Sequence, residues 1–308
     1  MTGPDDQPKL RMASRETAED VAQRVQREQR AGQRQRESEL QNSLAPFRVG
    51  SVGYLNAVPL TRGIEDEVLF DIPSRLAELL REDQLDAALV SIVEVLFSNR
   101  YEVLDGVAIA SLGEVRSVLL AHRKPLSEIR EVYCDTASLT SVELLRVLLA
   151  EQGLKPEFKR LQSYDFSALP DYTLLIGDRA LDFALGLPSA APGNEACCPA
   201  AASHQIWDLG AAWFEMTGLP FVYAAWALRS GIENASLRRQ LHEAHAFGQE
   251  TLDHIIRTRT EYDYDFRQDY LGWHIHYHLG ADEKRGIRKF IELLRKHGSR
   301  PIFEPKYV

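Results

Sequence analysis

Two polar side chains, Asn56 and Ser91, stand at or just beyond the ends of short apolar segments in the first third of the chain. The first segment runs into a turn of small residues that carries Tyr54 and Asn56, and the second segment ends in Ser91. In an open α/β sheet, ligands bind just outside the carboxyl ends of the strands. An amide and a hydroxyl at such positions orient a ligand through hydrogen bonds, so we expect a small-molecule site here. Ser91 also has a second interpretation, because its spacing to Glu94 is that of a helix capping box.

A further group of hydroxyls stands where an apolar segment meets a predicted helix. Residues 136–141 hold four hydroxyl side chains in six positions, among them Ser138, Thr140 and Ser141. The start of a helix offers free backbone N–H groups and the positive end of the helix dipole, which can bind a carboxylate without any Lys or Arg. The alternative is that these residues only cap their own helix.

Two charged residues have two interpretations each. Asp178 follows Gly177 at the end of an apolar segment, where it either orients a substrate hydroxyl or caps the next helix, and the pattern favours the cap. Arg116 stands near a predicted strand between the two halves of the chain. Its planar guanidinium suits a substrate carboxylate as well as a structural ion pair.

The sequence gives little support to a metal or a cofactor. His274 and His278 would lie one turn apart on a helix, but no carboxylate or Cys accompanies them at a recognised ligand spacing. The chain also lacks the dinucleotide-binding, P-loop, nucleophile-elbow and zincin motifs. We therefore expect no metal, no cofactor and no serine-hydrolase chemistry.

The composition is that of a soluble globular protein. The chain has 308 residues, 44% of them hydrophobic and 26% charged, and its net charge of -9 argues against a nucleic-acid partner. No stretch approaches the roughly 20 apolar residues of a membrane span, and the N-terminus has no secretory signal pattern. Three cysteines, at positions 134, 197 and 198, form neither a disulfide framework nor a CxxC metal site. We expect a cytoplasmic protein with a small-molecule substrate and no membrane partner.

Residues 1–46 differ from the rest of the chain, because they are rich in Arg, Gln and Glu and poor in large apolar residues. Such a segment buries little surface, which predicts a disordered extension or a frayed surface helix. From residue 47 onward, strand and helix patterns alternate, which favours an α/β fold with mainly parallel sheets. The expected strands are 48–52, 86–90, 107–111, 116–121, 131–134, 171–176 and 219–228, the expected helices are 73–82, 92–98, 138–151, 235–257 and 282–297, and 187–203 reads as a loop.

The order of these elements predicts two lobes. The pattern restarts near residue 123 and an apolar strand returns near residue 222, as expected when a second α/β domain is inserted into the first. Domain interfaces are preferred places for ligand clefts. The predicted lobes are 47–121 together with 222–308, and the inserted segment 122–221.

Several segments in order resemble a known family. They are VGYLNAVPL (52–60), the segments 73–94, 111–149, 174–181 and 207–229, and a YLxxHIxYxLG-like stretch at 270–280. The chain resembles the MqnA/MqnD family of menaquinone biosynthetic enzymes, and in particular its chorismate dehydratases. One departure is Val90, where relatives often carry Pro before the Ser. The resemblance implies a type II periplasmic-binding-protein-like fold, with two lobes around a ligand cleft.

The resemblance also implies an activity and a site. The activity is that of a carbon–oxygen lyase, which converts chorismate to 3-[(1-carboxyvinyl)oxy]benzoate and water in the futalosine route. Asn56 and Ser91 match the catalytic cleft residues of the first lobe. The implied substrate-binding residues are Tyr54, Arg116, Ser138, Thr140, Ser141, Gly177 and Asp178.

The proton acceptor has two candidates. In one version the substrate's own enolpyruvyl carboxylate takes the ring proton while Asn56 and Ser91 hold it in place. In the other version Glu94 or Asp178 is the base. We prefer the first version, because Asn and Ser are positioning groups rather than bases.

Two other functions compete with the dehydratase. The sister enzyme of the pathway, 1,4-dihydroxy-6-naphthoate synthase, shares the fold, but the GYLNAVPL stretch resembles the dehydratase more closely. A non-catalytic solute-binding protein would need export, for which the N-terminus shows no signal pattern.

Overall fold

A computed structural model describes residues 18–41, 43–135, 137–187 and 204–308. Thr136 and nearly all of the predicted loop 187–203, with Cys197 and Cys198, lie outside the described residues. Within the described part of the chain, no helix is both long and apolar enough to cross a membrane.

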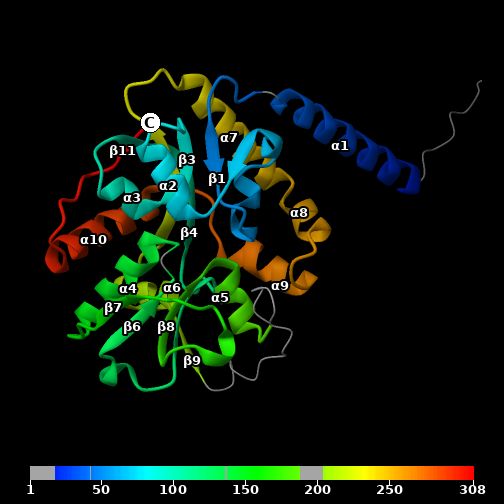
Figure 1. Cartoon of the computed structure of the whole chain (residues 1–308). Coiled ribbons are helices and arrows are strands. Elements are labelled where there is room, and N and C mark those ends of the chain that lie inside the picture. The colour runs from blue at the N-terminus through cyan, green and yellow to red at the C-terminus, as the bar shows by residue number, and fades with distance from the viewer. Residues whose placement is uncertain (1–17, 42, 136, 188–203) are drawn as a thin grey trace, which may run out of the picture.

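Two sheets form the centres of two lobes, which lie one above the other in Figure 1. The first sheet has the order β11-β4-β10-β3-β1-β2 and the second the order β7-β6-β8-β5-β9. The first sheet consists of β1 (Val49–Ser51), β2 (Val68–Phe70), β3 (Ala87–Ser91), β4 (Tyr101–Ser111), β10 (Phe221–Arg229) and β11 (Lys306–Tyr307). The second consists of β5 (Val118–His122), β6 (Glu131–Cys134), β7 (Glu157–Arg160), β8 (Tyr172–Ile176) and β9 (Gln205–Asp208). The two-lobed α/β fold predicted from the sequence is therefore confirmed.

The strand directions are more mixed than predicted. Strand β1 pairs in parallel with β2 and β3, but β10 runs antiparallel to both β3 and β4. In the second sheet, β5 is likewise antiparallel to β8 and β9. Strands β5 and β10 are the ones that follow a crossing between the sheets, so neither is joined to a neighbour of its own sheet by the strand–helix–strand connection that parallel strands require.

Helices cover the faces of both sheets. Those of the first lobe are α2 (Pro73–Arg81), α3 (Ile92–Leu96), α7 (Ala235–Glu250), α8 (Leu252–Thr258), α9 (Tyr264–Asp269) and α10 (Ala281–His297). Those of the second lobe are α4 (Leu139–Glu151), α5 (Gly177–Ala184) and α6 (Leu209–Thr217). Strand β5 pairs within the second sheet, although the partition predicted at 121/122 assigns it to the first lobe. The sheet pairing thus puts the first crossing between β4 and β5.

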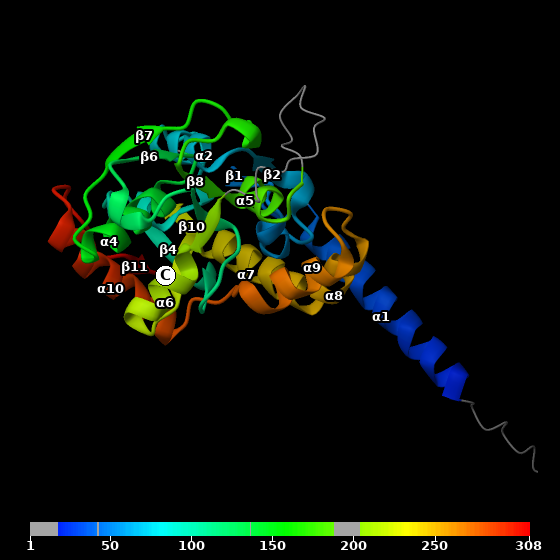
Figure 2. The same cartoon turned by 90° about the horizontal axis from the view of Figure 1, so that it is seen from below.

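The N-terminal segment contains a long helix, α1 (Ala18–Leu40), which corresponds to the surface-helix alternative over these residues. Its first half projects away from the body of the molecule (Figure 2). Its second half contacts α7, where Arg36 forms ion pairs with Glu243 and Glu250. The helix therefore rests on α7 by its C-terminal half.

A tight contact fixes the 3-10 helix Leu55–Leu60, which carries Asn56. Helix α7 packs against this turn, and a Cβ atom at Gly248 of α7 would lie only 1.8 Å from the Pro59 carbonyl oxygen. Only glycine allows the two backbones to approach so closely. The packing of α7 thus determines where the turn, and with it Asn56, can lie.

We predict that Gly248→Ala lowers the free energy of unfolding by about 3 kcal/mol, because backbone rather than a flexible side chain must move. Urea denaturation measures this loss. Gly32→Ala, in a helix with no atom near the added methyl group, is the matched control and should not lower stability. Equal stability of Gly248→Ala and the wild type would contradict the contact.

Candidate active site

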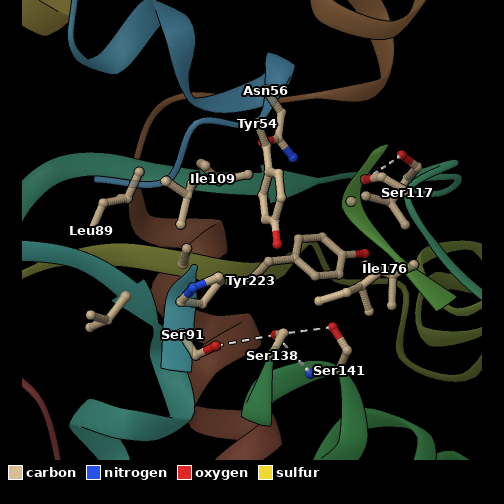
Figure 3. A pocket seen from close by; sticks show the side chains of 17 residues that line it. Tyr54, Asn56, Leu89, Ser91, Ile109, Ser117, Ser138, Ser141, Ile176 and Tyr223 are labelled. Atoms are coloured by element: carbon tan, nitrogen blue, oxygen red, sulfur yellow. Dashed lines mark hydrogen bonds between the residues drawn. The ribbon is translucent and has the colours of Figure 1, made fainter. Parts of the chain in front are cut away.

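A cleft lies between the lobes and is partly open to solvent. Seventeen residues line it, from both sheets and their connections (Figure 3). Six of the sequence-predicted site residues are among them: Tyr54, Asn56, Ser91, Ser138, Ser141 and Gly177. The remaining three, Arg116, Thr140 and Asp178, are not.

Three helices begin at this cleft. Ser91 is the N-cap of α3, Ser138 is the N-cap of α4, and Gly177 is the first residue of α5. Helix α3 comes from the first lobe, and α4 and α5 come from the second (Figure 1). Because helix N-termini carry partial positive charge and free N–H groups, the cleft is suited to an anion. No Lys, Arg, His, Asp or Glu is among the described residues that line it.

The two cleft serines meet across the lobes. The hydroxyl oxygens of Ser91 and Ser138 lie 3.1 Å apart, as the dashed line in Figure 3 shows. Although Ser91 occupies the N-cap position of α3, its hydroxyl makes no capping bond to this helix, so the capping-box interpretation of Ser91 is wrong. Ser138 does cap α4, since its Oγ accepts a hydrogen bond from the Ser141 N–H at 3.4 Å. Ser138 therefore serves as a cap and as a wall of the cleft at once.

Thr140 joins the lobes behind the cleft. Its side chain is fully buried, and its Oγ1 accepts a hydrogen bond from the Val93 N–H of α3 at 3.1 Å. The Val93 N–H lies in the first turn of α3 and has no partner within its own helix, so a residue of the other lobe accepts its hydrogen bond. Thr140 thus aligns the starts of α3 and α4 without facing the cleft.

Asn56 projects from the 3-10 helix toward the cleft (Figure 3). Its Oδ1 is buried and has no hydrogen-bond partner among the described residues. A buried acceptor without a partner costs about 1–3 kcal/mol. The amide therefore has hydrogen-bonding capacity that the protein itself does not use.

Tyr54 lies against Gly177 from the opposite lobe. Gly177 has a φ of +58°, and a Cβ atom there would lie 3.3 Å from the Tyr54 ring. Glycine is thus required both by the left-handed backbone and by the aromatic neighbour. Burial raises the pKa of Tyr54 to about 12, which keeps its hydroxyl neutral and able to donate a hydrogen bond.

Asp178 is a carboxyl group at the lobe interface rather than a helix cap. Ile176 occupies the N-cap position of α5, so the favoured capping interpretation is wrong. Burial raises the pKa of Asp178 to about 6, although a hydrogen bond from the Leu55 N–H of the first lobe acts in the opposite direction. The carboxyl group therefore touches the turn that carries Asn56.

Arg116 and Glu94 are engaged away from the cleft. The Arg116 guanidinium pairs with Asp269 at 3.0 Å, and its backbone N–H donates to Asp208 at 2.7 Å. The structural ion pair is thus the role that its geometry fits. Glu94 pairs with Arg81 at 3.0 Å, and burial raises its pKa. Neither side chain is placed to contact a ligand in the cleft.

The cleft also contains two polar residues that the sequence did not predict, Ser117 and Tyr223. Tyr223 is buried, and its hydroxyl lies 3.1 Å from the Ser111 Oγ. It reaches the cleft because Ala224 of β10 pairs with Ser91 of β3. The sequence predicts that β10 is an apolar strand, but it predicts neither the direction nor the register of this strand. It therefore does not show that Tyr223 faces the cleft.

The histidines do not assemble a metal site in the described residues, where no three His, Cys, Asp or Glu side chains are arranged to hold a metal ion. His274 lies at the end of a π-helical turn, and its Nδ1 lies 3.0 Å from the Glu114 carbonyl oxygen. Because the helix ends there, His274 and His278 do not lie one turn apart.

Comparison with known proteins agrees with this architecture. A protein-family model described as menaquinone biosynthesis matches residues 47–296. A chorismate dehydratase of Thermus thermophilus is 33% identical over 275 residues, which cover 85% of this chain and all of the relative. A chorismate dehydratase of Campylobacter jejuni is 27% identical over 246 residues, 78% of this chain and 89% of the relative.

Solved structures share the fold at low sequence identity. A protein from Archaeoglobus fulgidus superposes with a TM-score of 0.61 at 16% identity, covering 81% of this chain and 97% of the other. The periplasmic aliphatic sulphonate binding protein SsuA from Escherichia coli superposes with a TM-score of 0.52 at 13% identity, covering 85% of this chain and 93% of the other.

The two lobes and the cleft between them define a protein with a periplasmic-binding-protein-like fold. The chain belongs to the menaquinone biosynthesis family. It is an enzyme of that biosynthesis, as the resemblance of its sequence predicts.

We predict that Asp178 makes stability fall as pH rises. Its pKa is raised from 3.8 to about 6, so the folded state favours the protonated carboxyl group. Its contribution is fully present below about pH 4 and is lost as pH rises through about 6. Asp178→Asn cannot ionise, so its stability relative to the wild type should increase by about 1–3 kcal/mol between pH 4 and pH 7.

Urea denaturation of both proteins at several pH values measures this difference. Asp253→Asn, at a largely exposed carboxylate, controls for the loss of a surface charge. If the free energy of unfolding changed with pH in the same way for the wild type and Asp178→Asn, this result would contradict the burial of the carboxyl group.

Proposed function

We propose that this protein is a chorismate dehydratase, a hydro-lyase that converts chorismate to 3-[(1-carboxyvinyl)oxy]benzoate and water. The observation that carries the proposal is the cleft in which Asn56 and Ser91 face the starts of α4 and α5. The full-length match to the Thermus thermophilus dehydratase supports it. A cytoplasmic location belongs to the same proposal, and the free, buried Cys134 is compatible with a reducing compartment.

The cleft suits a dianion with an apolar ring. Three helix N-termini offer N–H groups and partial positive charge to two carboxylates, each terminus contributing about 0.3–1 kcal/mol. Apolar walls formed by Leu89, Ile109 and Val115 suit a six-membered carbon ring. The hydroxyls of Ser91, Ser138 and Ser141 add donors at the polar side of the cleft.

The reaction breaks the C–H bond at ring C3 and the C–O bond at C4. The hydroxyl leaves as water with the abstracted proton, and the ring becomes aromatic, which supplies much of the driving force. The enzyme then chiefly orients the substrate and stabilises developing charge. We assign this role to Asn56, whose Oδ1 has no protein partner, and to Ser91, whose hydroxyl is not used for capping.

The substrate's enolpyruvyl carboxylate is the proposed proton acceptor. No described residue that lines the cleft carries a charge, and Glu94 is paired with Arg81 outside it. Asp178 lies nearer, but it does not line the cleft and it receives the Leu55 N–H. A carboxylate that the substrate brings with it is already positioned when the substrate binds.

Incubation of the purified protein with chorismate, followed by ultraviolet absorption and mass spectrometry, tests the proposal. The expected result is catalytic formation of an aromatic product that is lighter than chorismate by one water molecule, about 18 Da. Binding of chorismate without turnover would indicate the solute-binding alternative. Turnover of a cyclic futalosine derivative but not of chorismate would indicate 1,4-dihydroxy-6-naphthoate synthase.

We predict that Asn56→Ala and Ser91→Ala each lower kcat/KM for chorismate by about 100- to 1,000-fold, the usual effect of removing one donor from a preorganised site. Steady-state kinetics measure the loss, and thermal unfolding checks that each variant is folded.

Matched controls lie beyond the C-terminal end of α3, the helix that begins after Ser91. Ser98 and Asn99 follow α3 and lie outside the cleft, so Ser98→Ala and Asn99→Ala should leave kcat/KM unchanged. Full activity of Asn56→Ala or Ser91→Ala would contradict the assignment of these two residues.

We predict that Glu94→Gln and Asp178→Asn keep kcat within about threefold of the wild type, because neither carboxyl group removes the proton. The kinetics are measured near pH 7, at which the side chains of Asn56 and Ser91 are uncharged. A loss of 100-fold or more in one folded variant would instead identify that residue as the base.

A further inference from the structure

The first crossing between the lobes supplies two residues of the cleft. This crossing segment, residues 112–117, connects β4 to β5, and its residues Val115 and Ser117 are buried and line the cleft. The Ser117 carbonyl oxygen also accepts the N–H of Gly177, the first residue of α5, at 2.8 Å. The places of these cleft residues therefore depend on what holds the crossing segment.

The carboxylate of Asp208 holds the crossing segment from the second lobe. Its Oδ2 accepts the Arg116 N–H at 2.7 Å, and the Val115 N–H donates to both oxygens, at 3.1 Å to Oδ1 and 3.2 Å to Oδ2. Its Oδ1 also accepts the N–H groups of Gly210 and Ala211 at 2.9 Å each, which caps α6. One side chain thus joins the start of α6 to the crossing segment.

Arg116 has a backbone conformation that needs such support. Its φ is +62°, in the left-handed region that residues other than glycine rarely adopt. A conformation of this kind costs free energy and persists only where the surrounding contacts impose it. The side chain of Arg116 pairs with Asp269, but these side chains are 38% and 44% exposed, and exposed ion pairs contribute little. The bond from the Arg116 N–H to Asp208 is therefore the stronger restraint.

Helix α6 also packs closely against the crossing segment. A Cβ atom at Gly210 would lie 2.5 Å from the Gly113 carbonyl oxygen and 2.6 Å from the hydroxyl oxygen of Tyr223, which lines the cleft. Only glycine allows this approach to the backbone of the crossing segment. A shift of the crossing segment relative to α6 would therefore change the shape of the cleft.

We propose that Asp208 is a positioning residue, which fixes the crossing segment to the start of α6 so that Val115 and Ser117 keep their places in the cleft. The inference rests on the proposed function, in which this cleft binds chorismate. Asp208 itself does not line the cleft, so it acts through these two residues. Its role concerns substrate binding, because Asn56 and Ser91, the residues assigned to the reaction, belong to the first lobe.

Asp208→Ser tests this role, because it separates the two tasks of the carboxylate. Serine is about as favourable as aspartate at a helix N-cap, but its shorter side chain has one oxygen and cannot also hold the crossing segment. We expect KM for chorismate to rise about 10-fold and kcat to change less than about threefold, because a binding wall is displaced while the reacting groups stay. A loss of folded protein alone would instead lower the apparent kcat and leave KM unchanged.

Asp263→Ser is the matched control. Asp263 caps α9, since its Oδ1 accepts the Phe266 N–H at 2.7 Å, but within the described residues its carboxylate holds no second segment. The same chemical change at this position should keep the wild-type KM. Thermal unfolding shows whether both variants are folded.

Asp208→Asn is the second variant, for the case that Asp208→Ser does not fold. It keeps the size of the side chain but turns one acceptor into a donor. We expect the amide oxygen to stay at the cap, because Oδ1 accepts three N–H groups and Oδ2 accepts two. The NH₂ group then faces the Arg116 N–H, so the same rise of KM is expected.

Amide hydrogen exchange followed by NMR, without substrate, tests the contact independently of turnover. The Val115 and Arg116 amides should exchange at least about 10-fold faster in the Asp208 variant than in the wild type, because their acceptor is lost. In Asp263→Ser, both amides should exchange at the wild-type rate.

Three results would overturn the proposal: unchanged exchange of both amides in the folded Asp208 variant, a wild-type KM in that variant, or an equal rise of KM in Asp263→Ser. If the wild type fails to convert chorismate, the proposed function fails. The exchange rates then still decide whether Asp208 holds the crossing segment, and unchanged rates refute the positioning role by themselves.

Discussion

The site depends on the contact between the starts of α3 and α4, where Ser91 and Ser138 meet at 3.1 Å. Each helix comes from a different lobe, so neither lobe alone brings the two N-termini together. The buried bond from the Val93 N–H to Thr140 supports the same contact from behind. Because no charged side chain of the described part lines the cleft, the backbone of these helices supplies the field that an anion meets. The chemistry of the site is therefore a property of how two lobes pack.

The sequence predicted the parts of the site that follow local rules. Asn56 lies in the turn that follows β1, Ser91 ends β3, and Ser138 caps α4, so their positions follow from strand ends and, for Ser138, from capping preferences. These residues do line one cleft. The α/β fold likewise follows from alternating strand and helix patterns together with the resemblance to a known family.

Long-range pairing accounts for what the sequence did not predict. Tyr223 reaches the cleft through the antiparallel register of β10 on β3, which no local pattern encodes. Strands β2, β7, β9 and β11 have only two to four residues, and β7 (EFKR) is mostly charged, so they lack a clear period. Arg116 and Asp178 were assigned to the substrate by resemblance, but their partners, Asp269 and the Leu55 N–H, come from distant parts of the chain. Tertiary contacts, rather than residue type, decide the role of such charged groups.

The glycine at position 177 also limits how the cleft can change. Its left-handed φ and its contact with the Tyr54 ring leave no room for a larger residue at this point of the second lobe. A cleft that is to accept a bulkier ligand must therefore be enlarged on the opposite side, where Leu89 and Ile109 form the wall. These apolar side chains stand on strands β3 and β4 rather than at a helix start or a tight turn. The substrate range of such proteins is thus more readily altered from the first lobe than from the second.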